Sequence, residues 1–244
     1  MKIEQITSKT FIHTQNTMRD SDGHGHPGPE TKGKSSLLTI KTDSGHEGHI
    51  VASPSDVQDT LLERFIRPNL IGQDPMCTDA LWYKIYKWQR LSSQLLTDRM
   101  LCAVDLALWD LRGKICNQPV WKLIGGYRPK ILAYGSTMCG DDLENGLATP
   151  EDYAHFATWM VQTRGYKGVK LHGWMPPMPG APDVRKDYKA CAAVREAVGP
   201  EIPLMLDPHH FYSRSEALWL ANKLVELDFS WMEEPMEEAS MSSF

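Results

Sequence analysis

The 244-residue sequence has no block of basic residues, and its formal charge of -5 is spread along the chain. Nucleic acids and anionic membrane surfaces therefore find no electrostatic anchor on it. It also has no apolar run long enough to cross a bilayer, and the acidic Glu4 stands where a signal peptide would be basic or apolar. We therefore expect a cytoplasmic protein whose partner is a small molecule, with no nucleic acid and no membrane.

Cysteine pairs are missing as well. The five cysteines are odd in number and widely spaced, and no C-x-x-C pattern indicates zinc or a redox site. Reduced thiols in a cytoplasmic protein are the simplest interpretation. With 41% hydrophobic and 23% charged residues, the chain has enough material for one large or two small globular domains.

The first half of the sequence reads as strands followed by helices, which is typical of an α+β unit. Between the first two strands, residues 14–34 are rich in Gly, Pro, Asp and His, and we expect a mobile loop without a regular element there. The last helix has one apolar stripe at intervals of three and four, from Met100 to Ile115. The expected strands are 2–13, 36–42 and 49–52, and the expected earlier helices are 56–70 and 79–91.

The pattern changes after residue 126, where short apolar runs alternate with amphipathic helices. This rhythm predicts β/α repeats with a parallel sheet, and the strands are almost continuously apolar, as in a sheet covered on both faces. The expected strands are 131–136, 168–172, 202–207 and 229–233, and the expected helices are 150–163, 185–198 and 215–227.

Ionisable residues end three consecutive strands of this repeat, at the edge where β/α proteins bind ligands. Lys170 and His172 share one face of their strand because side chains alternate. Burial and like charge would lower the pKa of both groups and provide a neutral base near pH 7. Alternatively, Lys170 is a lysine that pairs with a neighbouring carboxylate.

The next two strands end in acids. Asp207 closes an apolar strand and needs a cation or hydrogen bonds to compensate its charge. His209 is two residues further on and should point to the same side as Asp207. It is a candidate proton donor or second base, or an ordinary loop histidine. Glu233 lies on the same face of its strand as Trp231, and Glu234 lies on the opposite face. If Trp231 faces inward, Glu233 enters the site and Glu234 does not. Asp207 and Glu233 would then hold Mg²⁺, unless they form only a salt-bridge cluster with Lys170.

Two adjacent motifs resemble the mandelate racemase and muconate lactonizing group of the enolase superfamily. They are A-V-D-L-A-L-W-D-L-R-G-K at residues 103–114 and Q-P-V-W-K-L-I-G-G at residues 118–126. The resemblance implies an α/β fold in which an α+β capping domain, residues 1–126, precedes a TIM-type (β/α) barrel, residues 127–244. It further implies Mg²⁺ held by acids ending the third, fourth and fifth barrel strands. Asp207 and Glu233 match the first two.

The reaction implied by the resemblance is removal of the proton next to a carboxylate. This chain has K-x-H, with His172, where racemases and cycloisomerases of the group commonly have K-x-K. It has D-x-H, with His209, where D-x-N is common, and this resembles the sugar-acid dehydratases. We therefore expect His209 as general acid, His172 as base, and Lys170 as the cation that neutralises the substrate carboxylate of an acid sugar.

Further candidate substrate contacts are His24 and His26, in the segment that resembles the loop closing over the substrate, and Trp174, which follows the second barrel strand. A complete barrel has eight strands, and this chain supplies about four, so we expect an incomplete barrel with little turnover by itself. Relatives usually form homo-oligomers. The alternatives are a racemase, epimerase or cycloisomerase, and an inactive fragment that serves as an interaction module.

Overall fold

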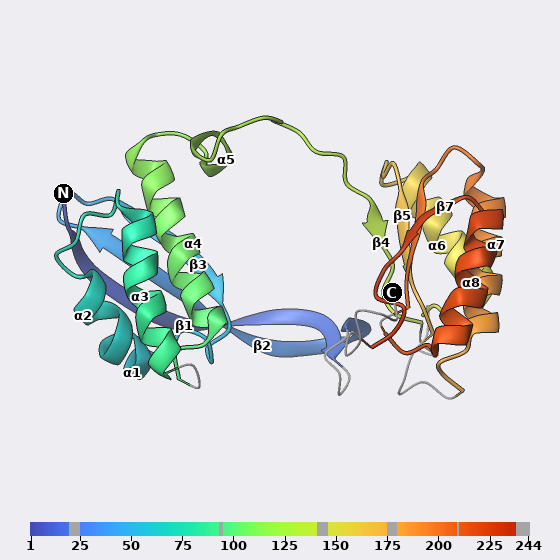
Figure 1. The fold of residues 1–244 in the computed structure, drawn as a ribbon, viewed down its shortest axis with the longest axis horizontal. Helices are drawn as coiled ribbons and strands as arrows, with labels where there is room; N and C mark the ends of the chain where they lie inside the picture. The colour runs from blue at the N-terminus through green and yellow to red at the C-terminus, as the bar shows by residue number, and fades with distance from the viewer. Residues whose placement is uncertain (20–24, 93–94, 141–145, 175–179, 209, 238–244) are drawn as a thin grey trace. The chain divides into compact units, whose positions relative to one another are not determined.

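The computed structural model describes residues 1–19, 25–92, 95–140, 146–174, 180–208 and 210–237 (Figure 1). The chain divides into two compact units. The first comprises residues 1–15 and 31–130, and the second comprises residues 16–30 and 131–244. Each unit has a hydrophobic core of its own.

An antiparallel sheet with the strand order β1-β2-β3 opens the chain. β2 and β3 pair in a register that places Leu38 opposite Ile50. The expected helix 56–70 is broken into two α-helical turns with a π-helical turn between them, and the two later helices lie where the periodicity predicts them. The elements are β1 (Ile3–Arg19), β2 (Gly25–Thr42), β3 (Glu47–Ala52), α1 (Asp59–Leu61), η1 (Leu62–Ile66), α2 (Arg67–Leu70), α3 (Thr78–Ser92), α4 (Asp98–Ile115) and α5 (Val120–Leu123).

The expected loop at residues 14–34 was wrong for the part that the structure describes, because β1 and β2 extend through residues 14–19 and 25–34. Cross-strand side-chain contacts support the pairing: Lys32 Nζ donates to Thr14 Oγ1 at 2.8 Å. Gly33 leaves room for the neighbouring strand, since a Cβ there would lie 2.6 Å from the side-chain oxygen of Gln15. Glycine in this segment therefore permits close packing of two strands and is no sign of a loop.

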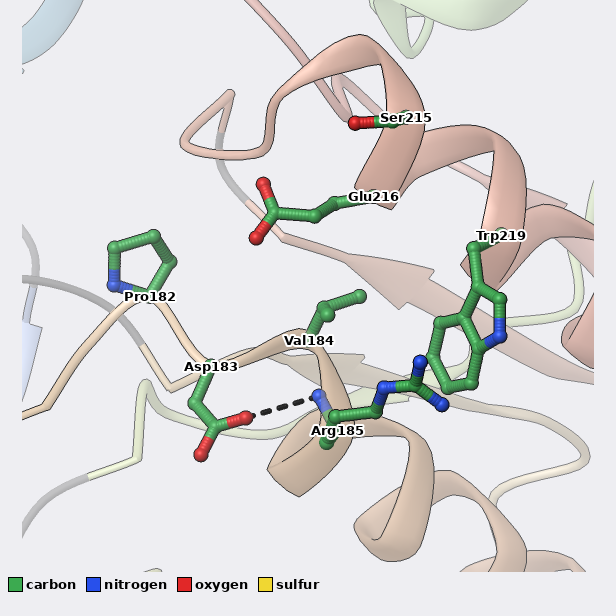
Figure 2. A pocket seen from close by; sticks show the side chains of 7 residues that line it. All are labelled: Pro182, Asp183, Val184, Arg185, Ser215, Glu216 and Trp219. Atoms are coloured by element: carbon green, nitrogen blue, oxygen red, sulfur yellow. Dashed lines mark hydrogen bonds between the residues drawn. The ribbon is translucent and has the colours of Figure 1, made fainter.

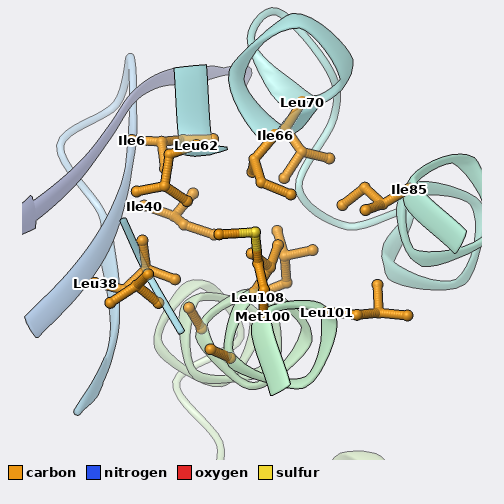
Figure 3. Close-up of a cluster of buried hydrophobic side chains, with 14 of the residues drawn as sticks. Ile6, Leu38, Ile40, Leu62, Ile66, Leu70, Ile85, Met100, Leu101 and Leu108 are labelled. Carbon is orange, nitrogen blue, oxygen red and sulfur yellow. The ribbon is translucent and has the colours of Figure 1, made fainter. Parts of the chain in front are cut away.

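The apolar stripe of α4 faces the core of the first unit, as its periodicity predicts (Figure 3). Thr97 caps the helix by accepting a hydrogen bond from the Met100 N–H. β3 lies directly against the helix: a Cβ on Gly48 would come within 2.2 Å of the Ala107 carbonyl oxygen. The buried side chains of the stripe are Met100, Leu101, Ala103, Val104, Ala107, Leu108 and Leu111.

The second unit is a four-stranded parallel sheet with helices between its strands, which confirms the β/α prediction. Capping boxes begin α6 at Thr149 and α8 at Ser213, and Asp183 caps α7. The first strand is much shorter than expected, because only Gly135 and Ser136 pair with β5. The elements are β4 (Gly135–Ser136), α6 (Pro150–Gln162), β5 (Val169–His172), α7 (Val184–Val198), β6 (Leu204–Asp207), α8 (Arg214–Glu226) and β7 (Phe229–Met232).

Candidate functional site

Three charged side chains at the ends of successive parallel strands meet at one point. Lys170 on β5 donates to Asp207 Oδ2 on β6 at 3.1 Å and to Glu233 Oε2, just after β7, at 2.9 Å. Two carboxylates that contact the same ammonium group face the same side of the sheet. The alternation argument for Lys170, Asp207 and Glu233 is therefore supported by the geometry.

His172 lies beside this cluster. Its Nδ1 is 3.6 Å from Asp207 Oδ2, and its side chain is 21% exposed, so the imidazole is shielded but reachable. The main chain of His172 is held on both sides, because its N–H donates to Thr137 Oγ1 at 2.8 Å and its carbonyl accepts from the Tyr153 hydroxyl at 2.9 Å. The imidazole is thus presented from a fixed segment of backbone.

The expectation of a lowered pKa for Lys170 was wrong. Burial alone lowers the pKa of this ammonium, but the hydrogen bonds that it donates to Glu233 and Asp207, with the negative charge of both, outweigh burial, and the net shift is upward. That expectation rested on burial and the neighbouring imidazole, whereas the alternative, a lysine that pairs with a neighbouring carboxylate, is the arrangement that the structure shows. These contacts therefore favour the charged form of Lys170.

The two acids differ in exposure. The Asp207 side chain is 7% exposed and the Glu233 side chain 38%, so Asp207 is enclosed while Glu233 faces the open side of the cluster. Trp231 Nε1 lies 3.4 Å from Glu233 Oε2, which agrees with the common parity of these two residues. The site therefore has a closed wall at β6 and an open wall at β7.

The donor set of this cluster fits a hard divalent cation. Carboxylate oxygens are the ligands that Mg²⁺ prefers, and Asp207 and Glu233 present two of them to a single cationic group. In the part of the chain that the structure describes, no three His, Cys, Asp or Glu side chains form a group that could hold a metal ion. The salt-bridge reading accounts for the contacts present, and the magnesium site stays a prediction.

The other candidate residues are placed less fully. His24 and His209 lie outside the described residues, and His26 lies in β2 without a described side chain. Trp174 is 6% exposed, and its indole ring lies 3.0 Å from Lys186 Nζ. Trp174 is thus buried, and its role as a substrate contact stays a prediction.

Sequence reasoning missed Asp187, which the structure buries next to the site. Its carboxylate accepts from the Trp174 N–H at 2.7 Å and from the Tyr212 hydroxyl. Burial raises its pKa to about 7, and the hydrogen bonds from Tyr212 and Trp174 act in the opposite direction. A signal existed in the sequence: Asp187 occupies a position on the apolar stripe of its helix, between Val184 and Cys191.

A hollow of about 450 Å³ lies between the first turns of α7 and α8 (Figure 2). At one side of the hollow, Arg185 Cζ lies 3.7 Å from the centroid of the Trp219 ring, on which the guanidinium stacks. The Asp183 carboxylate accepts a hydrogen bond from the Arg185 N–H. No residue that lines the hollow belongs to the lysine and carboxylate cluster. We therefore place the candidate site at the strand ends and not in this hollow.

An antiparallel sheet with helices, followed by β/α units that carry a lysine and two acids at their strand ends, defines an α/β protein of the β/α-barrel class. Two family models match the chain: the N-terminal domain of mandelate racemase and muconate lactonizing enzyme at residues 27–125, and the enolase C-terminal domain-like family at residues 152–243. The chain belongs to the mandelate racemase and muconate lactonizing group of the enolase superfamily. Its fold is an α+β capping domain followed by four strands of an incomplete β/α barrel.

Relatives include an arabinonate dehydratase from Saccharolobus solfataricus, 30% identical over 81% of this chain and 51% of its own length. A 3,6-anhydro-alpha-L-galactonate cycloisomerase from Streptomyces coelicolor is 31% identical over 72% of this chain and 45% of its own. The crystal structure of D-glucarate dehydratase from Agrobacterium tumefaciens, complexed with magnesium, superposes with a TM-score of 0.95 at 54% identity. This chain covers 63% of that structure and about half the length of the curated relatives.

The helices also bear on the membrane question. No described helix combines the length and the apolar character that spanning a bilayer requires.

The cysteines form no disulfide in the structure, because all five are free thiols.

Proposed function

We propose that the protein containing these residues is an acid-sugar dehydratase that removes the proton next to a carboxylate and then eliminates water. The observation that carries this proposal is the convergence of Lys170 on Asp207 and Glu233, with His172 in contact with the same Asp207 oxygen. A cation, two acids and an imidazole in one shielded place are what stabilising a developing carboxylate charge and moving a proton require.

Each residue has a proposed role. Lys170, held as a cation, neutralises the substrate carboxylate. His172 takes the proton from C2, and the electron pair of that C–H bond is first delocalised into the substrate carboxylate. It then forms the C2–C3 double bond as the C3–O bond breaks. His209 donates a proton to the leaving hydroxide, so that water departs and the enol product becomes a 2-keto-3-deoxy acid. When bound by Asp207 and Glu233, Mg²⁺ would supply positive charge to the substrate carboxylate.

The relatives support an acid sugar as the substrate class. The D-glucarate dehydratase structure is 54% identical to this chain, and the arabinonate dehydratase is named for the same reaction type. A screen of the full-length enzyme with Mg²⁺ against a library of acid sugars tests the proposal. We expect a 2-keto-3-deoxy product from at least one of them. Turnover without any keto product would contradict dehydration.

A second candidate is a cycloisomerase or racemase. The 31% identical cycloisomerase favours it, since that relative is similar in sequence and is named for an isomerase reaction. Solvent deuterium separates the two candidates: an isomerase returns labelled substrate or isomer without loss of water, whereas a dehydratase yields the keto acid. Replacing His209 by Asn should abolish only the dehydration.

We further propose that residues 1–126 act as the capping domain and residues 127–244 as the first part of the barrel. The described cluster supplies two carboxylates, and we therefore propose weak Mg²⁺ binding and little turnover for the 244 residues alone. Titration calorimetry with Mg²⁺ tests this, and tight stoichiometric binding would contradict it. Homo-oligomeric assembly and a cytoplasmic location stay predictions.

A further inference from the structure

A buried hydrogen-bonded pair, Asp187 and Tyr212, contacts residues adjacent in sequence to the candidate site residues. Asp187 on α7 and Tyr212 in the loop after β6 are 4% and 5% exposed. Tyr212 donates its hydroxyl to Asp187 Oδ2, while the other carboxylate oxygen accepts the Trp174 N–H at 2.7 Å. Both oxygens of this buried side chain thus have a hydrogen-bond partner, as buried polar groups require.

These bonds connect the loops that follow the three functional strands. Trp174 comes two residues after His172, and Tyr212 comes five residues after Asp207. The Tyr212 N–H in turn donates to the Pro235 carbonyl at 3.1 Å, two residues after the Glu233 carboxylate. The Asp187 carboxylate and Tyr212 therefore link the segments that follow β5, β6 and β7.

The packing around the pair leaves little room for movement. A Cβ on Gly173, the residue between His172 and Trp174, would lie 3.1 Å from Asp187 Oδ2. A Cβ on Gly140 would lie 2.4 Å from the Trp174 ring, so Trp174 is held between Gly140 and Lys186. The segment that presents the His172 imidazole is thus fixed from both the carboxylate side and the indole side.

We propose that Asp187 and Tyr212 are positioning residues that hold His172 and the neighbouring strand ends in the geometry needed for proton transfer. The proposal rests on the function proposed above, and it assigns no contact between these two residues and the substrate. Residues that support catalytic groups in this way commonly change rates by about 10-fold to 100-fold when they are replaced.

Arg195 provides a matched control at a part of the same unit that carries no candidate site residue. Its guanidinium donates to the carbonyls of Gly199, Ile202, Leu227 and Asp228 at 2.7–2.8 Å. It joins the segments that lead into β6 and β7, whereas Tyr212 joins the segments that leave these strands. Arg195→Lys therefore weakens the same unit without touching the loops at the candidate site.

The test uses the full-length protein with labelled histidine. The ring resonances of His172 are assigned by their loss in His172→Gln and then recorded without substrate in Tyr212→Phe, Asp187→Asn and Arg195→Lys. We expect Tyr212→Phe and Asp187→Asn to shift these resonances and to lower kcat at least about 10-fold with KM within about 3-fold. Arg195→Lys should change neither the His172 resonances nor kcat. It is measured at a temperature at which its remaining free energy of unfolding equals that of the other two variants.

Unchanged His172 resonances in folded Tyr212→Phe and Asp187→Asn would overturn the proposal. Equal shifts in Arg195→Lys would also overturn it, because they would reveal a purely structural effect. If the wild-type enzyme dehydrates no acid sugar, the proposed function fails, whereas the substrate-free resonances still decide whether Asp187 and Tyr212 position His172.

Discussion

Lys170 and Asp207 form a buried ion pair across two neighbouring parallel strands. Lys170 Nζ is 3.1 Å from Asp207 Oδ2, and the two side chains are only 9% and 7% exposed. Neither charge has enough water around it to be stable without the other, so removing one partner costs more than the pair itself contributes. The pair is therefore a sensitive point of the protein, for stability as well as for the proposed chemistry.

Replacing Lys170 by Met should destabilise the protein by about 3 kcal/mol, because Asp207 and Glu233 are left facing each other without a cation. Millimolar Mg²⁺ should restore part of this loss if the two carboxylates hold the ion, since binding to the native state stabilises it. Urea unfolding of the variant with and without Mg²⁺ measures both effects. A loss of stability that is indifferent to Mg²⁺ would count against the metal site.

Lys114→Met is the matched control for that experiment. Lys114 Nζ is 2.7 Å from Asp110 Oδ2, a shorter distance than in the buried pair, but these side chains are 45% and 38% exposed. Exposed pairs four residues apart on a helix contribute only about 0.3–0.5 kcal/mol. The control should therefore barely change the unfolding midpoint, with or without Mg²⁺.

The spacing of apolar residues in the sequence located the main helices and the parallel strands, because burying one face of an element requires apolar residues at regular intervals. The stripe of α4 and the strand ends at His172 and Asp207 lie where the sequence predicts them. The extended β1 and β2 were missed, because strand pairing between distant residues can override local turn chemistry. The segment 131–134 has strand composition, yet it pairs with no described strand.

The candidate site was predictable in its positions and not in its electrostatics. Strand parity placed Lys170, Asp207 and Glu233 together, but the pKa of Lys170 depends on distances that only coordinates give. Asp187 needed a different argument. A lone acid on a buried helix stripe indicates a partner, but the partner Tyr212 lies 25 residues away and no local pattern names it.

Gly48→Ala should destabilise the first unit by about 3 kcal/mol. The added methyl group would lie 2.2 Å from the Ala107 carbonyl and 2.5 Å from Leu111 Cβ, so strand β3 and helix α4 would have to separate. Gly168→Ala is the control, because its nearest neighbour would be at 3.3 Å. Thermal unfolding compares the two, and equal midpoints would show that β3 and α4 are not in such close contact.

Arg195→Lys should cost about 2 kcal/mol. A lysine keeps the charge but cannot reach the carbonyls of Leu227, Asp228, Gly199 and Ile202 together, which the planar guanidinium does. Denaturant unfolding measures the loss. Arg185→Lys, in which the guanidinium that stacks on Trp219 is replaced, serves as a comparison and should cost less than about 1 kcal/mol. If both variants lose the same amount, the four carbonyl contacts are not what stabilises this region.

The raised pKa of Asp187 predicts a dependence of stability on pH. Burial moves this pKa from 3.8 to about 7, so between these values the native protein keeps a proton that the unfolded chain releases. The Asp187 contribution to the unfolding free energy therefore falls as pH rises from about 4 to about 7, by roughly 4 kcal/mol at most. Asp187→Asn should lack this fall, as measured by urea unfolding at several pH values.

Tyr212→Phe provides a second test of the fall in stability that Asp187 causes as pH rises. The Tyr212 hydroxyl favours the charged form of Asp187, so its removal should raise the pKa of Asp187 further and extend the fall in stability above pH 7. The dependence of stability on pH measured for Asp187→Asn is subtracted from that of the wild-type protein and from that of Tyr212→Phe. The difference contains the contribution of the Asp187 carboxyl and leaves out those of Lys186 and Asp183 nearby. A difference profile that stays flat between pH 4 and pH 7 would mean that hydrogen bonding offsets burial and that Asp187 is an ordinary ionised carboxylate.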